Sequence, residues 1–493
     1  MKDISFRLFF IVTGLFFAGM SMLCSCEDEE SFTVDVNSLL SFSCDTVDFD
    51  TVLVGIGSST QRFKVYNKNN KGLIISKVSL ASDGQSGFRV NVNGQSGTDF
   101  HNMEIYDNDS MFVFVELTAK TQNSDLPVII EDSLVFTLQS GKIQSVVLTA
   151  RAQNVNLLKG EIITENRFFD ADKPYLIYDS LVVGPEALLE LNAGATLMFH
   201  SNADLIVRGQ LICKGTIDNP VVFRGARTDK MFPYLPYDRL DAQWGGIRIM
   251  PESFGNVFES VDIHGGSYGI ECSLAGIEYY KLQMHNSKVH NVSADALRMD
   301  YCAGRFVNCE FSNAGGNCVT LIGGYNEFAH CTLTQFYPWS AEHGSALYFC
   351  NVKNDTIYPL EKAEFYNCFI TGSGEDEIFG SRIEDDKVAF NCKFTGCAVN
   401  TDIEGESNKS YFVDCVAENA ENNAFKSNNF ICVDNDNYVY DFRLDSLSVA
   451  RGVGIGHLPD DCVFDKNGVE RPTLKPDAGC YQYVTKYMSS VCS

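Results

Sequence analysis

"FVNCEF", residues 306–311, is one copy of a six-residue frame that returns along the second half of this chain. Related hexapeptides stand at 328–333 (FAHCTL), 365–370 (FYNCFI) and 412–417 (FVDCVA). Each has an aromatic residue first, a polar residue third, a cysteine fourth and an apolar residue sixth. Self-similarity at a spacing of a few tens of residues is the signature of a solenoid, so this frame decides the fold.

The small residue at the fourth position of the frame measures the repeat. Aligned on it, the frame occurs at Val261, Ser287, Cys309, Cys331, Cys368, Cys392 and Cys415. The intervals are 26, 22, 22, 37, 24 and 23 residues. Four of the six fall within 22–24 residues, which predicts the coils of a three-sided β-helix, and the long interval predicts an inserted loop.

The recurring cysteines are interpreted as interior packing residues. Equivalent positions of successive coils stack about 4.8 Å apart, and a buried cysteine there acts as a small hydrophobe. Disulfides are the alternative, but parallel stacked backbones suit the disulfide dihedral poorly, which leaves a bridge among Cys462, Cys480 and Cys492 open. "CKFTGC" (392–397) has no second cysteine pair and no nearby histidine, so the sequence predicts no metal site and no cofactor.

Length and charge narrow the classes of function. The chain has 493 residues, which is long for one ordinary core but suits a fold that grows along an axis. Its formal net charge is −26, and no basic stripe offsets it. Phosphate backbones would repel such a surface, so nucleic acid is excluded as an expected partner.

Residues 31–155 have a different pattern from the rest. Short alternating segments such as "RFKVYN" (62–67) and "MFVFVELTA" (111–119) are separated by polar turns, which predicts an antiparallel β-sandwich. "FDTVLVGIGSSTQRFKVYN" (49–67), with the later "FRVNVNG" and "DSMFVFVELT", resembles the immunoglobulin-like domains of the abnormal-spindle and hydin type. The resemblance implies a structural or spacer module.

From residue 156 the chain resembles bacterial right-handed parallel β-helix proteins. The resemblance rests on "GATLMF", "ADLIVRGQLICKGT" and "NPVVFRG" within 181–225, and on "QWGGIRI" (243–249). Residues 442–483, ending in "KPDAGCYQY", resemble the closing motif of β-helix surface proteins, with departures at Cys480 and Gln482. We therefore expect an all-β chain, with the sandwich followed by a right-handed parallel β-helix over 156–483 and a tail at 484–493. The closing segment is expected to shield one end of the solenoid.

The N-terminus resembles a lipoprotein signal. A short apolar stretch (8–20) leads to "LCSC" (23–26), which resembles a bacterial lipobox and implies a signal peptide over 1–25 and lipidation of Cys26. The acidic linker 26–30, with "EDEE" after Cys26, resembles the surface-export signal of Bacteroidota lipoproteins. The resemblance implies an outer-membrane protein held through its lipid and facing the cell exterior. An ordinary signal peptide and a periplasm-facing anchor are the alternatives.

No set of residues predicts catalysis clearly. The best cluster, in 374–388, offers Asp376, Glu377, Arg382, Glu384, Asp385 and Asp386, and its plain interpretation is a solvated acidic loop. "DIHGG" (262–266) stands alone, and His264 is interpreted as a turn residue rather than a base. We therefore predict no catalytic residues, with Asp376, Arg382, Glu384, Asp385 and Asp386 as the alternative.

Two loops carry aromatic residues suited to sugar faces. "FPYLPYDRL" (232–240) and "TQFYPWSAEHG" (334–344) supply Tyr234, Tyr237, Tyr337 and Trp339 as predicted ligand-binding residues. The alternative is that these rings cover the flank of the solenoid, and Trp244 is assigned to packing. The resulting prediction is a non-catalytic surface scaffold that binds a polysaccharide or another surface ligand. The alternative is a polysaccharide lyase or glycoside hydrolase.

Overall fold

The computed structural model describes residues 31–485 except 384, 407, 419–425 and 457–459. Its contacts divide the chain into two units. One contains the described residues up to Lys120 together with Ile129–Arg151, and the other contains Thr121–Val128 and the chain from Ala152 onward. Within the described ranges, no helix combines the length and the apolar character needed to cross a bilayer.

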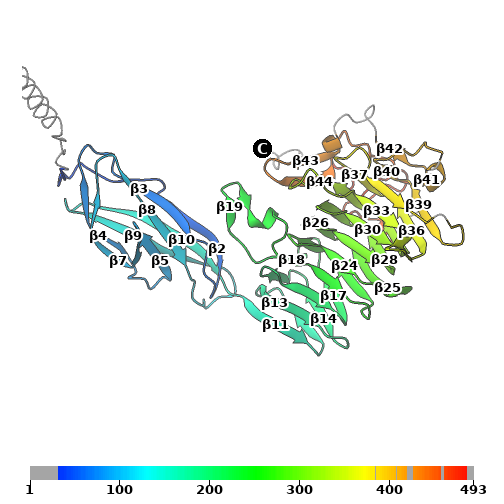
Figure 1. The fold of residues 1–493 in the computed structure, drawn as a ribbon, viewed down its shortest axis with the longest axis horizontal. Coiled ribbons are helices and arrows are strands. Elements are labelled where there is room, and N and C mark those ends of the chain that lie inside the picture. Colours follow the sequence, from blue (N-terminus) through cyan, green and yellow to red (C-terminus); the bar gives the residue numbers. More distant parts are fainter. Residues whose placement is uncertain (1–30, 384, 407, 419–425, 457–459, 486–493) are drawn as a thin grey trace, which may run out of the picture. The chain divides into compact units, whose positions relative to one another are not determined.

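The first unit is a sandwich of two five-stranded sheets (Figure 1). One sheet has the order β1 (Ser41–Phe42), β3 (Gln61–Tyr66), β8 (Ser110–Leu117), β5 (Phe88–Val92) and β6 (Gln95–Gly97). The other has the order β2 (Thr46–Leu53), β10 (Ile143–Gln153), β9 (Val128–Leu138), β4 (Leu73–Leu80) and β7 (Asp99–Ile105). Phe42 packs on Phe136 at 5.1 Å, joining the two inner faces, and alternate residues of β8 are buried. The predicted antiparallel β structure is confirmed, while the immunoglobulin-like class stays a prediction.

The second unit is a parallel β-helix, in which most strands stack in three columns (Figure 1). The first column contains β15 (Thr196–Phe199), β18 (Val221–Gly225), β23 (Val261–His264), β26 (Lys288–Val292), β29 (Glu310–Ala314), β32 (Thr332–Gln335), β37 (Phe369–Gly372), β40 (Ala398–Val399) and β42 (Val416–Ala417). The second contains β16 (Asp204–Val207), β21 (Ile247–Ile249), β24 (Ile270–Cys272), β27 (Leu297–Asp300), β30 (Val319–Ile322), β33 (Leu347–Cys350) and β38 (Ile378–Ser381). The third contains β12 (Arg167–Phe169), β14 (Leu188–Asn192), β17 (Gln210–Lys214), β22 (Asn256–Glu259), β25 (Gly276–His285), β28 (Cys302–Val307), β31 (Gly324–Ala329), β36 (Leu360–Tyr366), β39 (Phe390–Thr395) and β41 (Phe412–Val413).

The remaining elements start the solenoid or project from it. The long strands β11 (Asn156–Ile163) and β13 (Tyr175–Val183) begin it, and β13 pairs with β15 through its first half and with β16 through its second. Three antiparallel hairpins are β19 (Lys230–Phe232) with β20 (Leu235–Pro236), β34 (Val352–Lys353) with β35 (Thr356–Ile357), and β43 (Phe430–Asp434) with β44 (Val439–Leu444). The 3₁₀ turns are η2 (Tyr237–Arg239), η3 (Lys409–Tyr411), η4 (Lys426–Asn429) and η5 (Asp460–Cys462).

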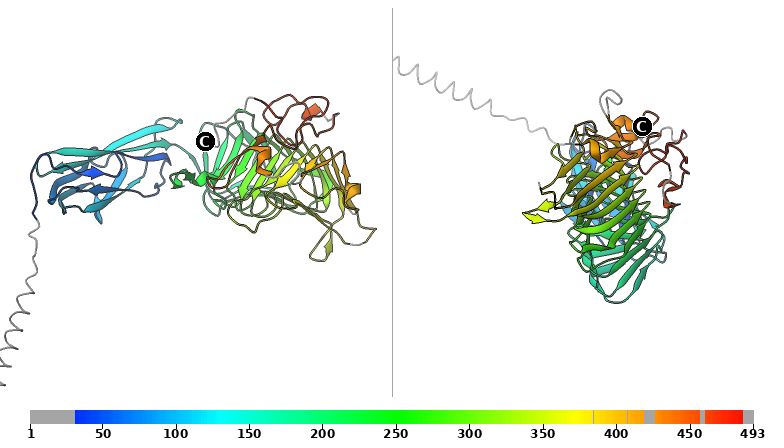
Figure 2. Two further views of the ribbon diagram at one scale, coloured as in Figure 1. Left: turned by 90° about the horizontal axis from the view of Figure 1, so that it is seen from above. Right: turned by 90° about the vertical axis from the view of Figure 1, so that its right-hand side faces the viewer.

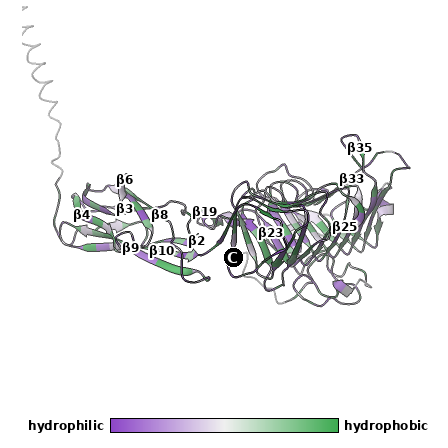
Figure 3. Ribbon diagram, turned by 90° about the horizontal axis from the view of Figure 1, so that it is seen from below, coloured by the Kyte–Doolittle hydropathy of each residue, from purple (hydrophilic) through white to green (hydrophobic). Residues whose placement is uncertain are grey.

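An aromatic ladder runs through the interior of the solenoid. Phe306, Phe328, Phe365, Phe394 and Phe412 stack in sequence, with ring centroids 4.6, 4.9, 4.7 and 4.8 Å apart. These spacings equal the distance between neighbouring strands, so each coil places one ring on the ring of the coil before it. Hydrophobic and hydrophilic residues alternate along the strands because one side of each strand faces this core (Figure 3).

A cysteine ladder lies beside the aromatic one, at the corner between the third and first columns. Cys309, Cys331, Cys368 and Cys397 are each fully buried and free. The predicted interior packing of the recurring cysteines is therefore confirmed for Cys309, Cys331 and Cys368. The predicted Cys415 is only partly buried. Of the cysteines left open for a bridge, Cys462 and Cys480 are free and Cys492 lies outside the described residues, whereas Cys432 is disulfide-bonded.

One position of the predicted repeat is wrong. Cys392 pairs in register with Ala363 inside a strand, and Phe394, not Phe390, stacks on Phe365. The small residue at the corner of this coil is therefore Cys397, whose Sγ accepts a hydrogen bond from the backbone N–H of Cys368 at 3.3 Å. Two overlapping frames, "AFNCKF" and "FTGCAV", compete in the sequence, and only the second continues the aromatic ladder.

The closing segment covers a face rather than an end. Figure 2 shows it, in orange and red, lying against one side of the stacked strands. Cys480 donates its backbone N–H to Thr332 Oγ1 at 3.0 Å, and Tyr481 donates its hydroxyl to Glu310 Oε2 at 2.6 Å. The first column carries apolar residues on its outward side there, and Phe369 and Ala398 are buried with Phe430 and Phe442 of the hairpin. The closing segment is expected from the sequence to cap one end of the solenoid. It lies on the side instead, because the outward apolar surface of the first column would otherwise be exposed to water.

Candidate functional site

The outward side of the first column changes character along its length. Under the closing segment it is mostly apolar or neutral, with the buried Glu310 bonded to Tyr481 as an exception, but at β23 and β26 it carries a cluster of charged side chains. Ile263 and Val289 point into the core, so their neighbours Asp262, His264 and Lys288 point outward. Register pairs Asp262 with Lys288 and His264 with His290, which places four ionisable groups on two adjacent strands.

Asp262 is the centre of this cluster. Its Oδ1 lies 2.8 Å from Nδ1 of His264 and 3.0 Å from Nε2 of His290. Its Oδ2 forms an ion pair with Nζ of Lys288 at 2.9 Å. The side chains of Asp262 and His290 are each 19% exposed, so the cluster is largely buried but remains accessible to water.

A second carboxylate comes from the loop that is inserted between β18 and β21. Asp238, in η2, accepts a hydrogen bond from Nε2 of His264 at 2.9 Å and pairs with Arg224 of β18 at 2.8 Å. Leu235 and Leu240, on either side of η2, are buried and anchor the loop. His264 is thus held between two carboxylates, one on its own strand and one on the inserted loop.

The pKa values of the cluster follow from this arrangement. Burial lowers the pKa of His264, but Asp262 and Asp238 outweigh it and raise that pKa to about 9. Burial raises the pKa of Asp262, but Lys288, His264 and His290 hold it well below the usual range for aspartate. Burial also raises the pKa of Asp238, but the hydrogen bond from His264 and the nearby cations lower that pKa overall. Burial and the charge of Lys288 lower the pKa of His290. At neutral pH the two aspartates are ionised and His264 is a cation.

The interpretation of His264 as a turn residue is wrong, because it ends strand β23. The sequence nevertheless carries a signal for this pair of histidines. The interval between Val261 and Ser287 is 26 residues, and the same offset carries His264 onto His290. Alternation then places Asp262 on the same outward side as His264. Asp238 could not be found this way, since its position depends on the loop conformation.

Three segments distant in sequence meet beside Asp238. Tyr337 donates its hydroxyl to Asp241 of the η2 loop. Arg239 of the same loop donates to the carbonyl of Asn437, at 3.1 Å, in the β43–β44 turn. The indole of Trp339 stacks on Tyr438 of that turn, with centroids 4.0 Å apart. The structure therefore joins the two predicted aromatic loops to each other and to the closing hairpin.

The four predicted ligand-binding rings differ in their surroundings. Tyr337 and Trp339 are half-buried through the contacts just described. Tyr237 is half-buried with the guanidinium of Arg227 3.3 Å from its ring centroid. Tyr234 is 53% exposed and packs on the exposed Phe232. Trp244, assigned to packing, is buried against Phe199, so that prediction is confirmed.

The predicted acidic alternative does not form a convergent set in the described residues. Asp376, Asp385 and Asp386 are exposed, and Glu384 lies outside the described residues. Asp376 and Asp385 instead accept backbone N–H groups two residues further on, as turn residues do. Glu377 is buried, and its two oxygens accept the N–H groups of Gly374 and Ala346, each at 2.8 Å.

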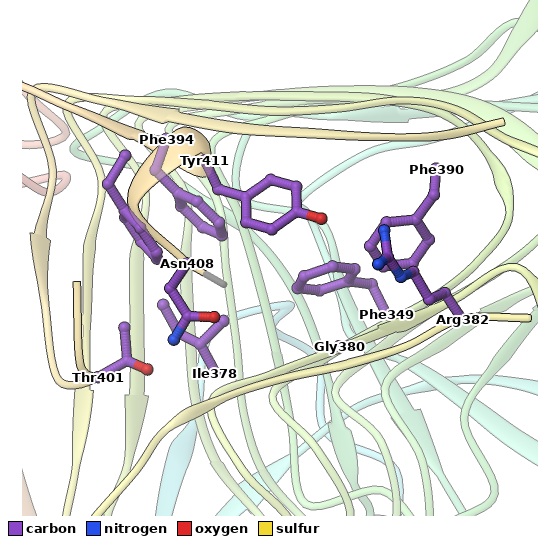
Figure 4. A pocket seen from close by; sticks show the side chains of 10 residues that line it. Phe349, Ile378, Gly380, Arg382, Phe390, Phe394, Thr401, Asn408 and Tyr411 are labelled. Carbon is purple, nitrogen blue, oxygen red and sulfur yellow. The ribbon is translucent and has the colours of Figure 1, made fainter. Parts of the chain in front are cut away.

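Arg382 is separated from these carboxylates. It lines a cavity of about 220 Å³ together with aromatic residues of the last coils, Phe349, Phe390, Phe394, Tyr411 and Phe412 (Figure 4). None of Asp376, Asp385 and Asp386 lines this cavity. Arg382 is itself exposed, and no carboxylate of the described residues lines this cavity, so Arg382 has no acid–base partner among them there.

The comparisons with known proteins give only distant likenesses. No family model matches the chain, and no curated protein matches it. Among solved structures, the catalytic unit of a GH87 α-1,3-glucanase from Streptomyces thermodiastaticus is similar over 72% of this chain and 74% of its own, at 11% identity and a TM-score of 0.30. An ASH/PapD-like domain of a human protein is similar over 27% of this chain and 96% of its own, at 9% identity and a TM-score of 0.17. A family 123 glycoside hydrolase from Clostridium perfringens is similar over 23% of this chain and only 25% of its own, at 11% identity and a TM-score of 0.17.

Proposed function

We propose that the chain is a non-catalytic, cell-surface scaffold that binds glycans. The glycan would lie beside the charged cluster on β23 and β26. The observation that carries this proposal is the junction of three segments through Trp339–Tyr438, Tyr337–Asp241 and Arg239–Asn437. It places half-buried aromatic rings on loops that a rigid solenoid positions, next to charged and polar groups. Sugars are bound by this combination of ring faces and hydrogen-bonding groups.

The backbone of Tyr438 supports a functional role for this junction. Its φ is +56°, in the left-handed region that non-glycine residues seldom adopt. Such a conformation costs on the order of 1 kcal/mol and persists where the surroundings demand it. Tyr438 holds this conformation in the turn where its ring stacks on Trp339.

The ionisation of the cluster favours binding over hydrolysis. A glycoside hydrolase needs one carboxylic acid that is protonated near neutral pH. The pKa values of Asp238 and Asp262 are both lowered, so neither carboxyl group is poised to donate a proton. A polysaccharide lyase or glycoside hydrolase remains the alternative function, and the glycan experiment below distinguishes it.

Attachment to the outer membrane through Cys26 belongs to the same proposal. Its support is the lipobox-like "LCSC" and the acidic residues after it. Replacing Cys26→Ala should move the protein from the membrane fraction to the soluble fraction. Retention in the membrane fraction would show that Cys26 is not the anchor.

The glycan proposal is tested with the purified chain on a panel of immobilised polysaccharides. Trp339→Ala and Tyr438→Ala should each weaken binding about twofold to tenfold, since ring stacking contributes roughly 0.5–1.5 kcal/mol beyond area burial. Tyr279→Ala is the matched control, because Tyr279 is 74% exposed on β25 in the third column. Equal loss in the control, or no binding to any glycan, would contradict the proposal. Release of new reducing ends or unsaturated products would instead establish the enzymatic alternative.

A further inference from the structure

We infer that Asp262, His264 and His290 form a binding site for a divalent transition metal of the zinc class. One ligand atom from each of these side chains lies within 4.8 Å of the other two. The inference is independent of glycan binding, because it concerns only the cluster on β23 and β26.

The backbone presents these groups in a fixed arrangement. Asp262 and His264 alternate on one strand and so share its outward side, while His290 stands in register with His264 on the next strand. Zinc binds imidazole nitrogen and carboxylate oxygen at about 2.0–2.2 Å, which requires ligand atoms roughly 3.3–3.6 Å apart. The carboxylate oxygen of Asp262 lies 2.8 and 3.0 Å from the two ring nitrogens, so small outward rotations of the side chains seat an ion.

A supporting shell of hydrogen bonds surrounds the three ligands. His264 uses its second ring nitrogen to contact Asp238 at 2.9 Å, which is the carboxylate–histidine–metal relay common in protein metal sites. Arg224 in turn holds Asp238 at 2.8 Å. Lys288 binds the other oxygen of Asp262 at 2.9 Å and leaves Oδ1 as a single-oxygen ligand.

The hydrogen bonds of His264 show which proton a metal ion would replace. Each ring nitrogen of His264 contacts a carboxylate oxygen, and the cationic imidazole satisfies both contacts with its two N–H groups. An ion bound at Nδ1 would displace the Nδ1 proton and leave the Nε2–H group donating to Asp238. The ion would then stand in the place of that proton, between His264, Asp262 and His290.

The ligand types and the exposure define the ion and its reactivity. Two imidazoles and one carboxylate favour Zn²⁺, Co²⁺ or Ni²⁺ over Mg²⁺ or Ca²⁺, which prefer oxygen ligands. Three protein ligands leave a coordination position open to water or to an external ligand. The 19% exposure of Asp262 and of His290 leaves a route to that position.

The test uses the full chain, stripped of metal with a chelator and titrated with Co²⁺ and Zn²⁺. We expect about one additional equivalent of Zn²⁺ in the parent chain relative to His290→Gln, with affinity lowered about 100-fold or more in the variant. Cobalt should give visible absorption bands of a nitrogen–oxygen site in the parent and not in the variant. His200→Gln is the control, since His200 is an exposed histidine that follows β15 of the same column.

Thermal unfolding gives a second readout that does not depend on spectra. Zn²⁺ should raise the unfolding temperature of the parent and of His200→Gln, but not that of His290→Gln, which should fold because His290 is only partly buried. Ca²⁺ should have no such effect. Equal uptake and equal stabilisation by Zn²⁺ in the parent and in His290→Gln would overturn the inference.

Discussion

The indole of Trp339 lies flat on the phenol ring of Tyr438, with centroids 4.0 Å apart and ring planes inclined by only 9°. The two residues come from different insertions, so this stack fastens the 334–344 loop to the β43–β44 turn. A double-mutant cycle with Trp339→Ala and Tyr438→Ala should give a coupling energy of about 0.5–1.5 kcal/mol. Urea unfolding followed by circular dichroism measures it, and additive effects would show that the stack contributes no stability of its own.

The interior aromatic ladder predicts a large cost for removing one ring. Phe365 is fully buried and stacks on Phe328 at 4.9 Å and on Phe394 at 4.7 Å. Phe365→Ala should therefore lower the free energy of unfolding by about 3–5 kcal/mol, through lost burial and the cavity left behind. Phe379→Ala, at a ring that is 49% exposed, should change it by no more than about 0.5 kcal/mol. Similar losses in both variants would argue against the ladder as a main source of stability.

The cysteine ladder predicts which thiols resist labelling. Burial raises the pKa of the Cys309 and Cys331 thiols well above the usual range, and neither side chain is accessible. Neither should react with a water-soluble disulfide reagent at pH 8 until the chain unfolds. Cys44 is partly exposed and should react first. Peptide mapping of the labelled native protein checks this order, and early modification of Cys309 would contradict it.

The buried carboxyl group of Glu377 should make the stability of the chain depend on pH. Burial raises the pKa of its carboxyl group from 4.5 to about 7, against the opposing hydrogen bonds from Gly374 and Ala346. The folded chain then binds this proton more tightly than the unfolded chain does. The contribution to stability is greatest below pH 4.5 and declines as the pH rises toward 7, by up to about 3 kcal/mol.

The variant Glu377→Gln tests this directly, because its side chain does not titrate. The free energy of unfolding should fall less between pH 4.5 and 7 in the variant than in the parent. Asp386→Asn, at an exposed carboxyl further along the same loop, is the control and should keep the parent's slope. Parallel slopes in Glu377→Gln and the parent would show that Glu377 does not titrate in this range.

The repeat was readable from the sequence because stacking imposes it. Each coil must place its ring on the ring of the coil before it, so Phe306, Phe328 and Phe365 each recur with a cysteine three residues later, even across the inserted loop. Where a coil length changes, the pattern alone cannot choose between overlapping frames. The spacing favours Cys392 as the corner residue of that coil. The stacking of Phe394 on Phe365 shows that the corner residue is Cys397.

The candidate sites were less predictable, since they combine the regular scaffold with irregular loops. His264 and His290 are related by the coil length and were within reach of the sequence pattern. Asp238 and Tyr438 belong to insertions, and no periodicity relates them to the strands that they approach. The aromatic loops were identified by composition, but their junction through Asp241 and Asn437 is visible only in three dimensions.

The bond from Tyr481 to Glu310 spans 171 residues of sequence. During synthesis the N-terminal coils emerge first, so each new coil can stack on a neighbour that has already formed. The outward face around Phe369 and Ala398 has no such partner until the last residues arrive. Folding therefore ends with a long-range step, and until that step is complete an apolar surface is open to other chains. Nascent or truncated molecules that lack residues 430–483 should depend on chaperones far more than the complete protein does.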